Sequence, residues 1–354
     1  MIPEKSKLQI WLIVIPLALF FAVFSFGGAK SSGLVAPGAT VKLVQSGFNG
    51  TEGPATDADG NVYFTEVFGS KIDKWTWKDG KVTLYRENTG QANGMMFDAK
   101  GNLVICEMGN RKVTRDDLKN NVTIIADTVN GKKMLMPNDL WIDLRGGIYI
   151  SHMYMNIPTR IDRGGAPGGG MPGGERRGEP SSGGMPQGER RGGPPEGGMP
   201  LPAGVDAKEL GIVYIAPDGK KASLVTDDLA GPNGLIGTPD GKTLYVGDRG
   251  KVWSYKINPD GTLSEKKLFC EKNTDGMAMD EKLNVYLTAG SSILAYSPAG
   301  ELVEEIALPE GSSNVEFCGR DRKTLFITYM GNIYTLEMTV RGAPTALDLA
   351  TGKK

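Results

Sequence analysis

Six segments of the chain share one plan, and this repeat limits the fold more than any other feature. Each segment has a short polar motif, an apolar strand, a turn that usually contains glycine, and a second apolar strand. The first polar residues of these motifs are Glu52, Asn93, Asn138, Asn233, Asp275 and Asn314. Successive motifs start 41, 45, 95, 42 and 39 residues apart, so all spacings except one fit a period near 40. Such a period is typical of a four-stranded propeller blade.

One further apolar strand precedes the first motif, at residues 40–46, with the sequence TVKLVQS. In a closed ring this strand would complete the last blade beside NIYTLEM at residues 332–338, which removes an exposed sheet edge. No long segment has helical periodicity. The sequence therefore predicts an all-β fold, a six-bladed β-propeller of four-stranded blades closed by an N-terminal strand.

The one long spacing is explained by residues 163–203, which are dominated by Gly, Pro, Arg and Glu. This composition buries too little apolar surface to offset the entropy lost on ordering, so we expect a disordered insertion in the third blade. The expected organisation is a signal peptide or signal anchor at 1–29 and a linker at 30–38. The propeller then spans 39–345, and a tail follows at 346–354.

The N-terminus has the pattern of an export signal. Lys5 and Lys7 precede an apolar run over residues 8–26, and small residues follow at 27–29. The pattern predicts an exported protein, periplasmic or extracellular. The run is also just long enough to span a bilayer, so an uncleaved membrane anchor is an open alternative.

Charge and cysteine content exclude several classes of function. The net charge of −1 gives no reason to expect a nucleic-acid partner. Cys106, Cys270 and Cys318 have no CxxC spacing, which excludes a thiolate zinc site and a disulfide framework but leaves one bridge open. A closed propeller has no sticky edge, so a monomer is expected.

Strand direction predicts where polar side chains gather. Each motif lies where the chain enters an innermost strand, and the next strand returns to the same face of the ring. Residues at the ends of the returning strands should therefore lie near the motif residues. This return set consists of Glu66, Glu107, His152, Asp248, Ala289 and Tyr329.

Carboxylates and side-chain amides without cysteine are typical of a site for a hard cation, Ca²⁺, Mg²⁺ or Mn²⁺, and carboxylates also bind Zn²⁺. The alternative is that the Asn-Gly and Asp-Gly pairs are tight-turn residues. Glu52 fits that alternative poorly, because its EGP sequence is a poor turn and a buried lone carboxylate is costly. We therefore expect one divalent cation, with Ca²⁺ the first choice.

These motifs resemble those of the senescence marker protein/gluconolactonase/luciferin-regenerating enzyme family of six-bladed propellers. The resembling segments are EGP from Glu52, NGMMFDAKGNLVICEMGNRKVTR from Asn93, PNDLWID from Pro137, PNGLIGTPDGKTLYVGD from Pro232 and TDGMAMDE from Thr274. The resemblance covers nearly the whole chain after about residue 39, apart from the insertion. It implies metal-assisted hydrolysis of a sugar lactone or a related ester.

The resemblance also implies roles for individual residues. Glu52, Asn233 and Asp248 correspond to the metal ligands, and Asp248 would also accept a proton during catalysis. Asn138 corresponds to an asparagine that contacts the substrate or lies near the metal. From their places at the channel mouth, Asn93, Glu107 and Asp275 are further expected substrate contacts. His152, the only histidine, is a candidate acid or base, and the alternative is that it packs or hydrogen-bonds at the channel mouth.

Two departures from the family pattern affect the expected substrate. Met108 stands where the family often has histidine, and the third blade reads SHM where the family often has TDP. Two other functions therefore stay open: a non-catalytic propeller that binds a ligand or protein, and a strictosidine-synthase-like enzyme. The latter shares the fold but does not require the Glu, Asn and Asp ligand set.

Overall fold

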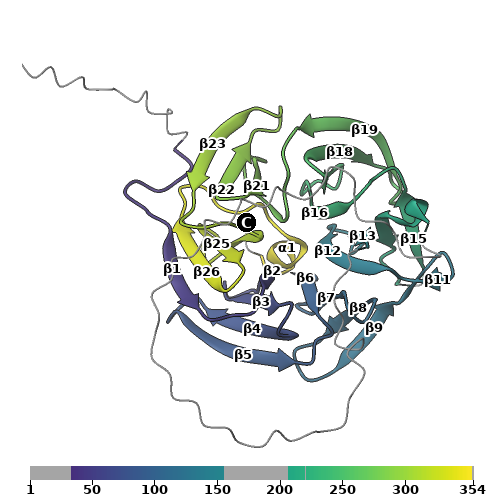
Figure 1. Ribbon diagram of the computed structural model, residues 1–354, viewed down its shortest axis with the longest axis horizontal. Coiled ribbons are helices and arrows are strands. Elements are labelled where there is room, and N and C mark those ends of the chain that lie inside the picture. The colour runs from purple at the N-terminus through teal and green to yellow at the C-terminus, as the bar shows by residue number, and fades with distance from the viewer. Residues whose placement is uncertain (1–32, 155–205, 220, 353–354) are drawn as a thin grey trace, which may run out of the picture. The chain divides into compact units, whose positions relative to one another are not determined.

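The computed structural model describes residues 33–154, 206–219 and 221–352. Six four-stranded antiparallel sheets are arranged around a central axis (Figure 1). The predicted all-β six-bladed propeller is therefore confirmed.

Each of the first three blades runs outward from the channel in chain order. The first contains β2 (Thr51–Thr56), β3 (Val62–Glu66), β4 (Lys71–Thr76) and β5 (Lys81–Glu87). The second contains β6 (Ala92–Phe97), β7 (Leu103–Glu107), β8 (Lys112–Asp116) and β9 (Val122–Ala126). The third contains β12 (Met136–Ile142), β13 (Ile148–Met153), β14 (Gly211–Ile215) and β15 (Ala222–Thr226), and the small hairpin of β10 (Thr128–Val129) and β11 (Lys132–Lys133) precedes it.

The second half of the ring repeats this order. The fourth blade contains β16 (Pro232–Gly237), β17 (Thr243–Asp248), β18 (Lys251–Ile257) and β19 (Leu263–Cys270). The fifth contains β20 (Met277–Met279), β21 (Val285–Ala289), β22 (Ser292–Tyr296) and β23 (Leu302–Ala307). The sixth contains β24 (Asn314–Cys318), β25 (Thr324–Tyr329) and β26 (Asn332–Glu337).

The outermost strand of the sixth blade comes from the other end of the described chain. β1 (Lys42–Ser46) pairs antiparallel with β26, with Lys42 opposite Thr335 and Ser46 opposite Asn332. In Figure 1 the two strands lie side by side, β1 in purple and β26 in yellow. The predicted closure by an N-terminal strand is confirmed.

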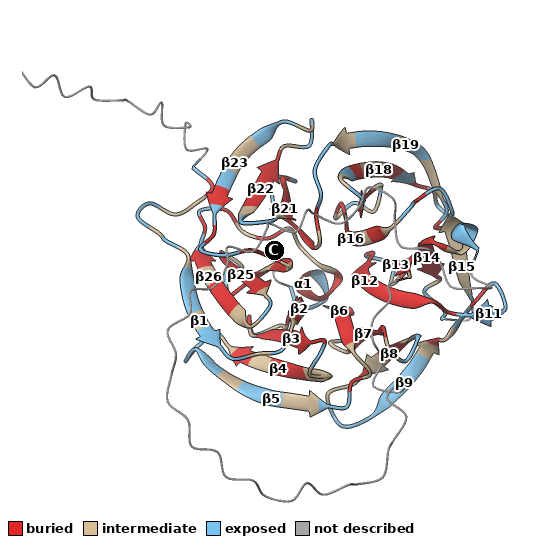
Figure 2. Cartoon of the chain, viewed as in Figure 1, coloured by how far each residue is buried: buried red, intermediate tan, exposed pale blue. Residues whose placement is uncertain are grey.

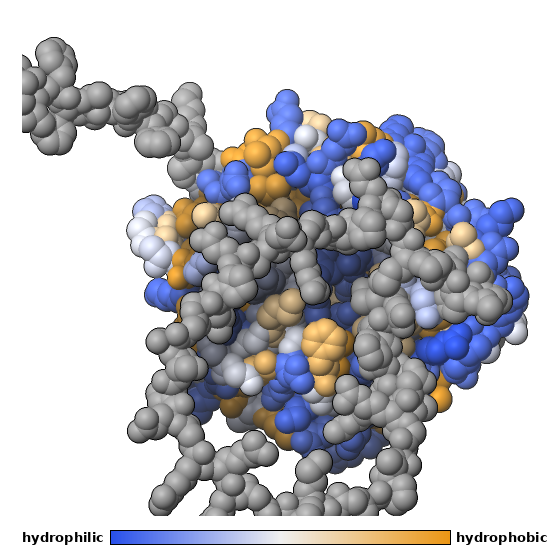
Figure 3. All heavy atoms as spheres, viewed as in Figure 1, coloured by the Kyte–Doolittle hydropathy of each residue, from blue (hydrophilic) through white to orange (hydrophobic). Residues whose placement is uncertain are grey.

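The core lies between the blades, where the second strands are buried on both faces (Figure 2). Aromatic side chains fill two of these interfaces. Trp75 of the first blade lies 5.4 Å from Phe326 of the sixth, centroid to centroid, and Trp141 lies 5.7 Å from Tyr149 at the interface of the third and fourth blades. Of the outermost strands, β1, β5 and β9 expose most of their residues, whereas β15 is half-buried throughout. The rim over β15, β18 and β19 is mostly hydrophilic in Figure 3.

Two segments expected to lie outside the propeller belong to it. In the predicted linker, Leu34 is 3% exposed and packs in the core of the last blades, and Val35 pairs with Met338. In the predicted tail, α1 (Ala346–Ala350) buries Ala346, Leu347 and Asp348. Both segments carry apolar side chains that the ring would otherwise leave uncovered, which corrects the expected boundaries.

The predicted signal segment and the predicted insertion lie outside the described residues. The chain leaves β13 after Met153 and re-enters the same blade through a short 3₁₀ turn, η2 (Ala207–Glu209), before β14. All three cysteines are free thiols, so the bridge that the sequence left open is not formed. No helix in the described ranges is long and apolar enough to cross a membrane.

Candidate functional site

A cavity opens where the chain enters the innermost strands. We call it the mouth cavity. Five of the six motif residues line it: Glu52, Asn93, Asn138, Asn233 and Asp275. The remaining lining residues are Gly50, Thr51, Val67, Phe68, Met108, Ser312, Ser313, Tyr329 and Met330. The prediction that the motifs converge at one face of the ring is confirmed for these five.

The glycine that follows several motif residues brings neighbouring blades close together. A Cβ atom on Gly53 would lie 1.9 Å from the backbone oxygen of Asn93, and one on Gly234 would lie 2.1 Å from that of Asp275. Only glycine permits this approach, since any side chain would overlap the backbone of the next blade. These glycines therefore set the spacing of the polar groups around the channel.

A β-bulge lies at the motif in four of the innermost strands. In the first blade the pairing advances from Glu52–Thr65 to Ala55–Tyr63, three residues on β2 against two on β3. The same shift occurs in β6, β12 and β16. Because a bulge interrupts the alternation of side chains, it can direct a polar residue toward the channel from an otherwise regular strand.

Two carboxylates and an amide form the polar centre of the mouth cavity. Asn233 Nδ2 donates a hydrogen bond to Asp275 Oδ1 at 2.7 Å, and Asn233 Oδ1 is buried without a partner. Glu52 Oε2 accepts from the backbone N–H of Gly53 at 3.2 Å and from Asn314 Nδ2 at 3.4 Å. Three oxygen-bearing side chains from three blades thus lie together here, and one of their oxygens, Asn233 Oδ1, has no hydrogen-bond partner.

Burial and mutual repulsion disfavour two negative charges at this position. Burial raises the pKa of Glu52 well above its usual value, and the charge of Asp275 raises it further. Burial also raises the pKa of Asp275 to about 6, against the hydrogen bond from Asn233. Among the described residues that line the cavity there is no Lys, Arg or His to offset this charge.

The donor set fits a hard divalent cation. Carboxylate and amide oxygens are the ligands that Ca²⁺ prefers, and a buried amide oxygen without a partner needs a donor or a cation. A bound cation would also remove the repulsion between Glu52 and Asp275. In the described part of the chain, no group of three or more His, Cys, Asp and Glu side chains is placed to hold a metal, so this site depends on its amide oxygen.

Asp248, predicted as the third ligand, does not line the mouth cavity. Its Oδ1 accepts hydrogen bonds from the backbone N–H groups of Ala230 at 3.0 Å and Gly231 at 2.7 Å. The register explains this position, because Asp248 lies opposite Pro232 rather than Asn233. Directly opposed residues point to the same face of a sheet, so Asp248 shares its face with Pro232, and the bulge after Pro232 separates Asn233 from this pairing. Asp275, predicted as a substrate contact, lies beside Asn233 instead.

Glu107, predicted as a substrate contact, also lies outside the cavity lining. Its oxygens accept from Thr114 Oγ1 at 2.8 Å and Asn110 Nδ2 at 2.7 Å, and Lys112 Nζ lies 3.3 Å away. It is opposite Ala92, the residue before motif residue Asn93, so the same register rule applies. The structure gives Glu107 contacts within its own blade.

His152, predicted as an acid or base, is buried away from the mouth cavity. Its Nε2 accepts from the backbone N–H of Leu135 at 2.7 Å, and its Nδ1 lies 2.7 Å from the backbone oxygen of Glu209. These partners fix the tautomer with the proton on Nδ1. Burial lowers the pKa of the ring, which favours the neutral imidazole. Both of its nitrogens are already engaged in hydrogen bonds to the backbone.

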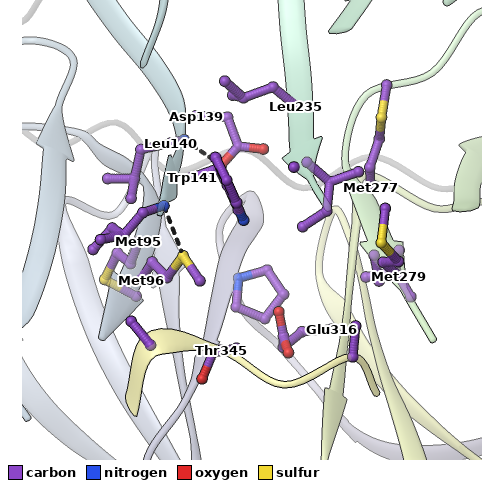
Figure 4. A pocket seen from close by; sticks show the side chains of 18 of the residues that line it. Met95, Met96, Asp139, Leu140, Trp141, Leu235, Met277, Met279, Glu316 and Thr345 are labelled. Atoms are coloured by element: carbon purple, nitrogen blue, oxygen red, sulfur yellow. Dashed lines mark hydrogen bonds between the residues drawn. The ribbon is translucent and has the colours of Figure 1, made fainter. Parts of the chain in front are cut away.

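A second cavity lies further along the same innermost strands. We call it the plug cavity, because the C-terminal segment 343–346 closes it. The carboxylates of Asp139 and Glu316 project into it, with Thr345 at its edge (Figure 4). Sequence reasoning missed both acids, although Asp139 follows Asn138 and Glu316 lies two residues after Asn314 on the same strand.

The acids of the plug cavity have internal partners. Glu316 Oε1 lies 3.1 Å from Arg322, whose guanidinium also lies 3.8 Å from Asp348 of α1. Burial raises the pKa of Glu316 to about 7, against the charge of Arg322. Burial likewise raises the pKa of Asp139 to about 7, against a hydrogen bond from the backbone N–H of Leu140.

Known proteins share these motifs and this fold. The model of the SMP-30/gluconolactonase/LRE-like region matches residues 50–170 and 195–331. A gluconolactonase of Zymomonas mobilis is 23% identical over 83% of this chain and 80% of its own length.

Two solved structures also superpose well. One, described as a candidate gluconolactonase, has a TM-score of 0.70 and 25% identity, covering 88% of this chain and 96% of its own. A gluconolactonase of Xanthomonas campestris has a TM-score of 0.68 and 23% identity, covering 87% and 92%. The chain therefore belongs to the SMP-30/gluconolactonase/LRE-like family.

Proposed function

We propose that the chain is a divalent-metal-dependent hydrolase that opens lactones or related esters in the mouth cavity. The observation that carries this proposal is the meeting of Glu52, Asn233 and Asp275, with the Asn233 Oδ1 atom buried and unpartnered. The relatives named gluconolactonase support a lactone as the substrate.

Glu52, Asn233 and Asp275 would hold the cation, with Ca²⁺ favoured by the all-oxygen donor set. A cation bound there supplies Lewis-acid chemistry, since it polarises an ester carbonyl and acidifies water. This assignment replaces Asp248 with Asp275, because Asp275 lines the cavity and hydrogen-bonds to Asn233.

The chain's own groups would orient the substrate and move the proton. Asn93 and Asn138 line the cavity beside the proposed ligands, so their amides can hydrogen-bond to the ester oxygens. Asp275 Oδ2, the oxygen that Asn233 does not use, would accept a proton from the attacking water. Addition of water to the carbonyl carbon breaks the ring C–O bond, and the proton passes to the departing oxygen, giving a hydroxy acid.

The test compares the two candidate aspartates in the same assay. Hydrolysis of aldonolactones, alkyl lactones and aryl esters is measured after EDTA treatment and again after adding Ca²⁺, Mg²⁺, Mn²⁺ or Zn²⁺. We expect EDTA to abolish turnover and Asp275→Asn to lower kcat/KM by more than about 100-fold, because a ligand is lost. Asp248→Asn, the matched control, should change it only severalfold.

Three outcomes would contradict parts of this proposal. A large loss in Asp248→Asn with little effect in Asp275→Asn would restore Asp248 as the ligand. A folded protein that binds metal but hydrolyses no substrate would favour a non-catalytic binding propeller. A folded protein that binds no metal would overturn the ligand assignment.

We also propose that the protein is exported, cleaved or anchored through residues 1–29, and monomeric. The proposal rests on the charged start, apolar run and small residues of the N-terminus, and on the ring closure by β1 and β26. Cell fractionation with N-terminal sequencing tests the first part, and light scattering tests the second. A full-length cytoplasmic product, or a stable dimer, would contradict it.

A further inference from the structure

The rim of the mouth cavity differs in chemistry from its floor. The floor consists of the carboxylates and amides described above, whereas Phe68, Tyr329 and Met330 lie at the rim, and the buried side chains of Val67 and Met108 complete the apolar part of the lining. Phe68 is 61% exposed and Met330 is 59% exposed, and few other large apolar side chains of the described residues are as exposed. Exposed apolar groups gathered around a polar centre mark a binding surface.

Backbone contacts hold the two most exposed side chains in place. The N–H of Phe68 donates to the oxygen of Asn49 at 3.2 Å, and its ring covers Gly50, where a Cβ atom would lie 2.5 Å from the ring. The oxygen of Met330 accepts from the N–H of Thr51 at 2.7 Å. Phe68 and Met330 therefore lie on turns of the first and sixth blades, and both turns hydrogen-bond to the segment 49–51.

The hydroxyl groups in the lining offer few free donors for a sugar. Thr51 Oγ1 donates to the oxygen of Asn332 at 3.0 Å, and Ser313 Oγ donates to the oxygen of Thr51 at 2.8 Å. Ser312 Oγ donates to the oxygen of Gly290 at 3.2 Å. Among these hydroxyls only that of Tyr329 has no such backbone acceptor. A polyhydroxylated ring would lose water on entry without equivalent partners at the rim.

The charge of the cavity lining further limits the class of substrate. Among the described lining residues none is basic, while Glu52 and Asp275 are acidic. One divalent cation would balance these two charges and leave none for an anionic group on the far side of a substrate.

Resting on the proposed hydrolase function, we infer that the preferred substrates are neutral lactones or esters with an alkyl or aryl substituent beside the ester. The ester group lies on the polar floor, and the substituent lies against Phe68 and Met330. The bond hydrolysed is the ester bond of the proposed function. The rim therefore sets the substrate specificity and takes no part in proton transfer.

The test uses the full purified chain with Ca²⁺ and three δ-lactones. These are δ-decalactone with its pentyl substituent, unsubstituted δ-valerolactone, and polyhydroxylated glucono-δ-lactone. We expect kcat/KM for δ-decalactone to exceed that for the other two by roughly tenfold or more, because burial of each methylene group is favourable.

Two rim variants should weaken this preference. Phe68→Ala removes the ring, and Met330→Asn removes an apolar side chain while suiting the left-handed φ of 47° at this turn. Each should raise KM for δ-decalactone by roughly fivefold to tenfold and leave kcat and the KM of δ-valerolactone nearly unchanged. Ile124→Ala, at an equally exposed apolar residue on β9, is the matched control and should change nothing.

A binding measurement separates this inference from the proposed function. The ketone 3-pentylcyclohexanone has the shape of δ-decalactone, with a methylene in place of the ring oxygen, but cannot be hydrolysed, and calorimetry gives its Kd. Binding weakened by Phe68→Ala, without turnover of any lactone, would support the apolar rim and contradict the hydrolase. Preference for glucono-δ-lactone with no effect of Phe68→Ala would support the hydrolase and overturn the apolar rim.

Discussion

The mouth cavity and the plug cavity use the same innermost strands but treat buried acids differently. In the plug cavity, Arg322 lies 3.1 Å from Glu316, and Asp348 of α1 lies 3.8 Å from the same guanidinium. In the mouth cavity, Glu52 and Asp275 have no basic side chain among the described lining residues. A buried acid with a counter-charge from its own chain is already neutralised, whereas two acids without one are the arrangement on which the proposed cation site rests.

The largest expected effect comes from removing the internal counter-charge of the plug cavity. Arg322→Met leaves Glu316 without its partner, while Glu316 keeps 24% of its side-chain exposure, so the cost should be about 2–4 kcal/mol of unfolding free energy. Urea denaturation measures this. Adding Glu316→Gln should recover most of the loss, and a single-variant effect below about 1 kcal/mol would mean that the pair contributes little.

A cation should stabilise the protein through the mouth cavity alone. Ca²⁺ at a hundred times its Kd should add about 2.7 kcal/mol to the unfolding free energy, measured as a rise in Tm over an EDTA sample. Glu52→Gln should remove this rise, and Glu316→Gln should retain it. Equal loss in both variants would show that the two cavities are not distinct in cation binding.

The acids of the plug cavity should make stability depend on pH. The pKa of Asp139 is raised to about 7 in the folded protein, mainly by burial and further by Asp275 and Glu316, against hydrogen bonds from Leu140 and Asn314. The folded state then binds the proton more tightly than the unfolded state, so stability falls as pH rises from about 4 to 7. In EDTA, Asp139→Asn should flatten the decline of Tm over this range by a few degrees. An unchanged slope would contradict the raised pKa.

The smallest expected effect concerns the helix that covers the plug cavity. Thr345 caps α1, since its hydroxyl accepts from the N–H of Asp348 and donates to the Asp348 carboxylate. Thr345→Ala should cost about 1 kcal/mol of unfolding free energy and leave kcat/KM unchanged, because the cap touches only the plug side. Thr351→Ala, at the exposed end of α1, should cost less. A fall in kcat/KM would show that the two cavities are coupled.

The repeat predicted the fold because every blade has the same sequence of strands and turns. It also placed Glu52, Asn93 and Asn233 correctly at the mouth, since strand direction alone decides which end of a strand they occupy. It failed for Asp248 and His152, because the side-chain face depends on the pairing register. In four blades that register includes a bulge at the motif, and the extra residue leaves no mark in the spacing of the repeats.

Sequence reasoning also missed the contacts of the C-terminal segment near the plug cavity. Arg322 lies on a hairpin and Asp348 lies in the segment predicted to be a tail, and the two residues come into contact only in the folded ring. Leu34 was missed for a related reason, since two adjacent apolar residues, Leu34 and Val35, in a stretch of small residues give no periodic signal.

The pairing of β1 with β26 means that the propeller closes only after its last strand, β26, has been synthesised. β1 has its neighbour available only after residues 332–337 have emerged, and the entropy of closing so long a loop delays the pairing. Until then β1 and the unfinished ring expose unpaired strand edges to other chains. Termination of synthesis before β26 therefore does more than remove one strand. It leaves β1 without its pairing partner, which favours aggregation of the nascent protein.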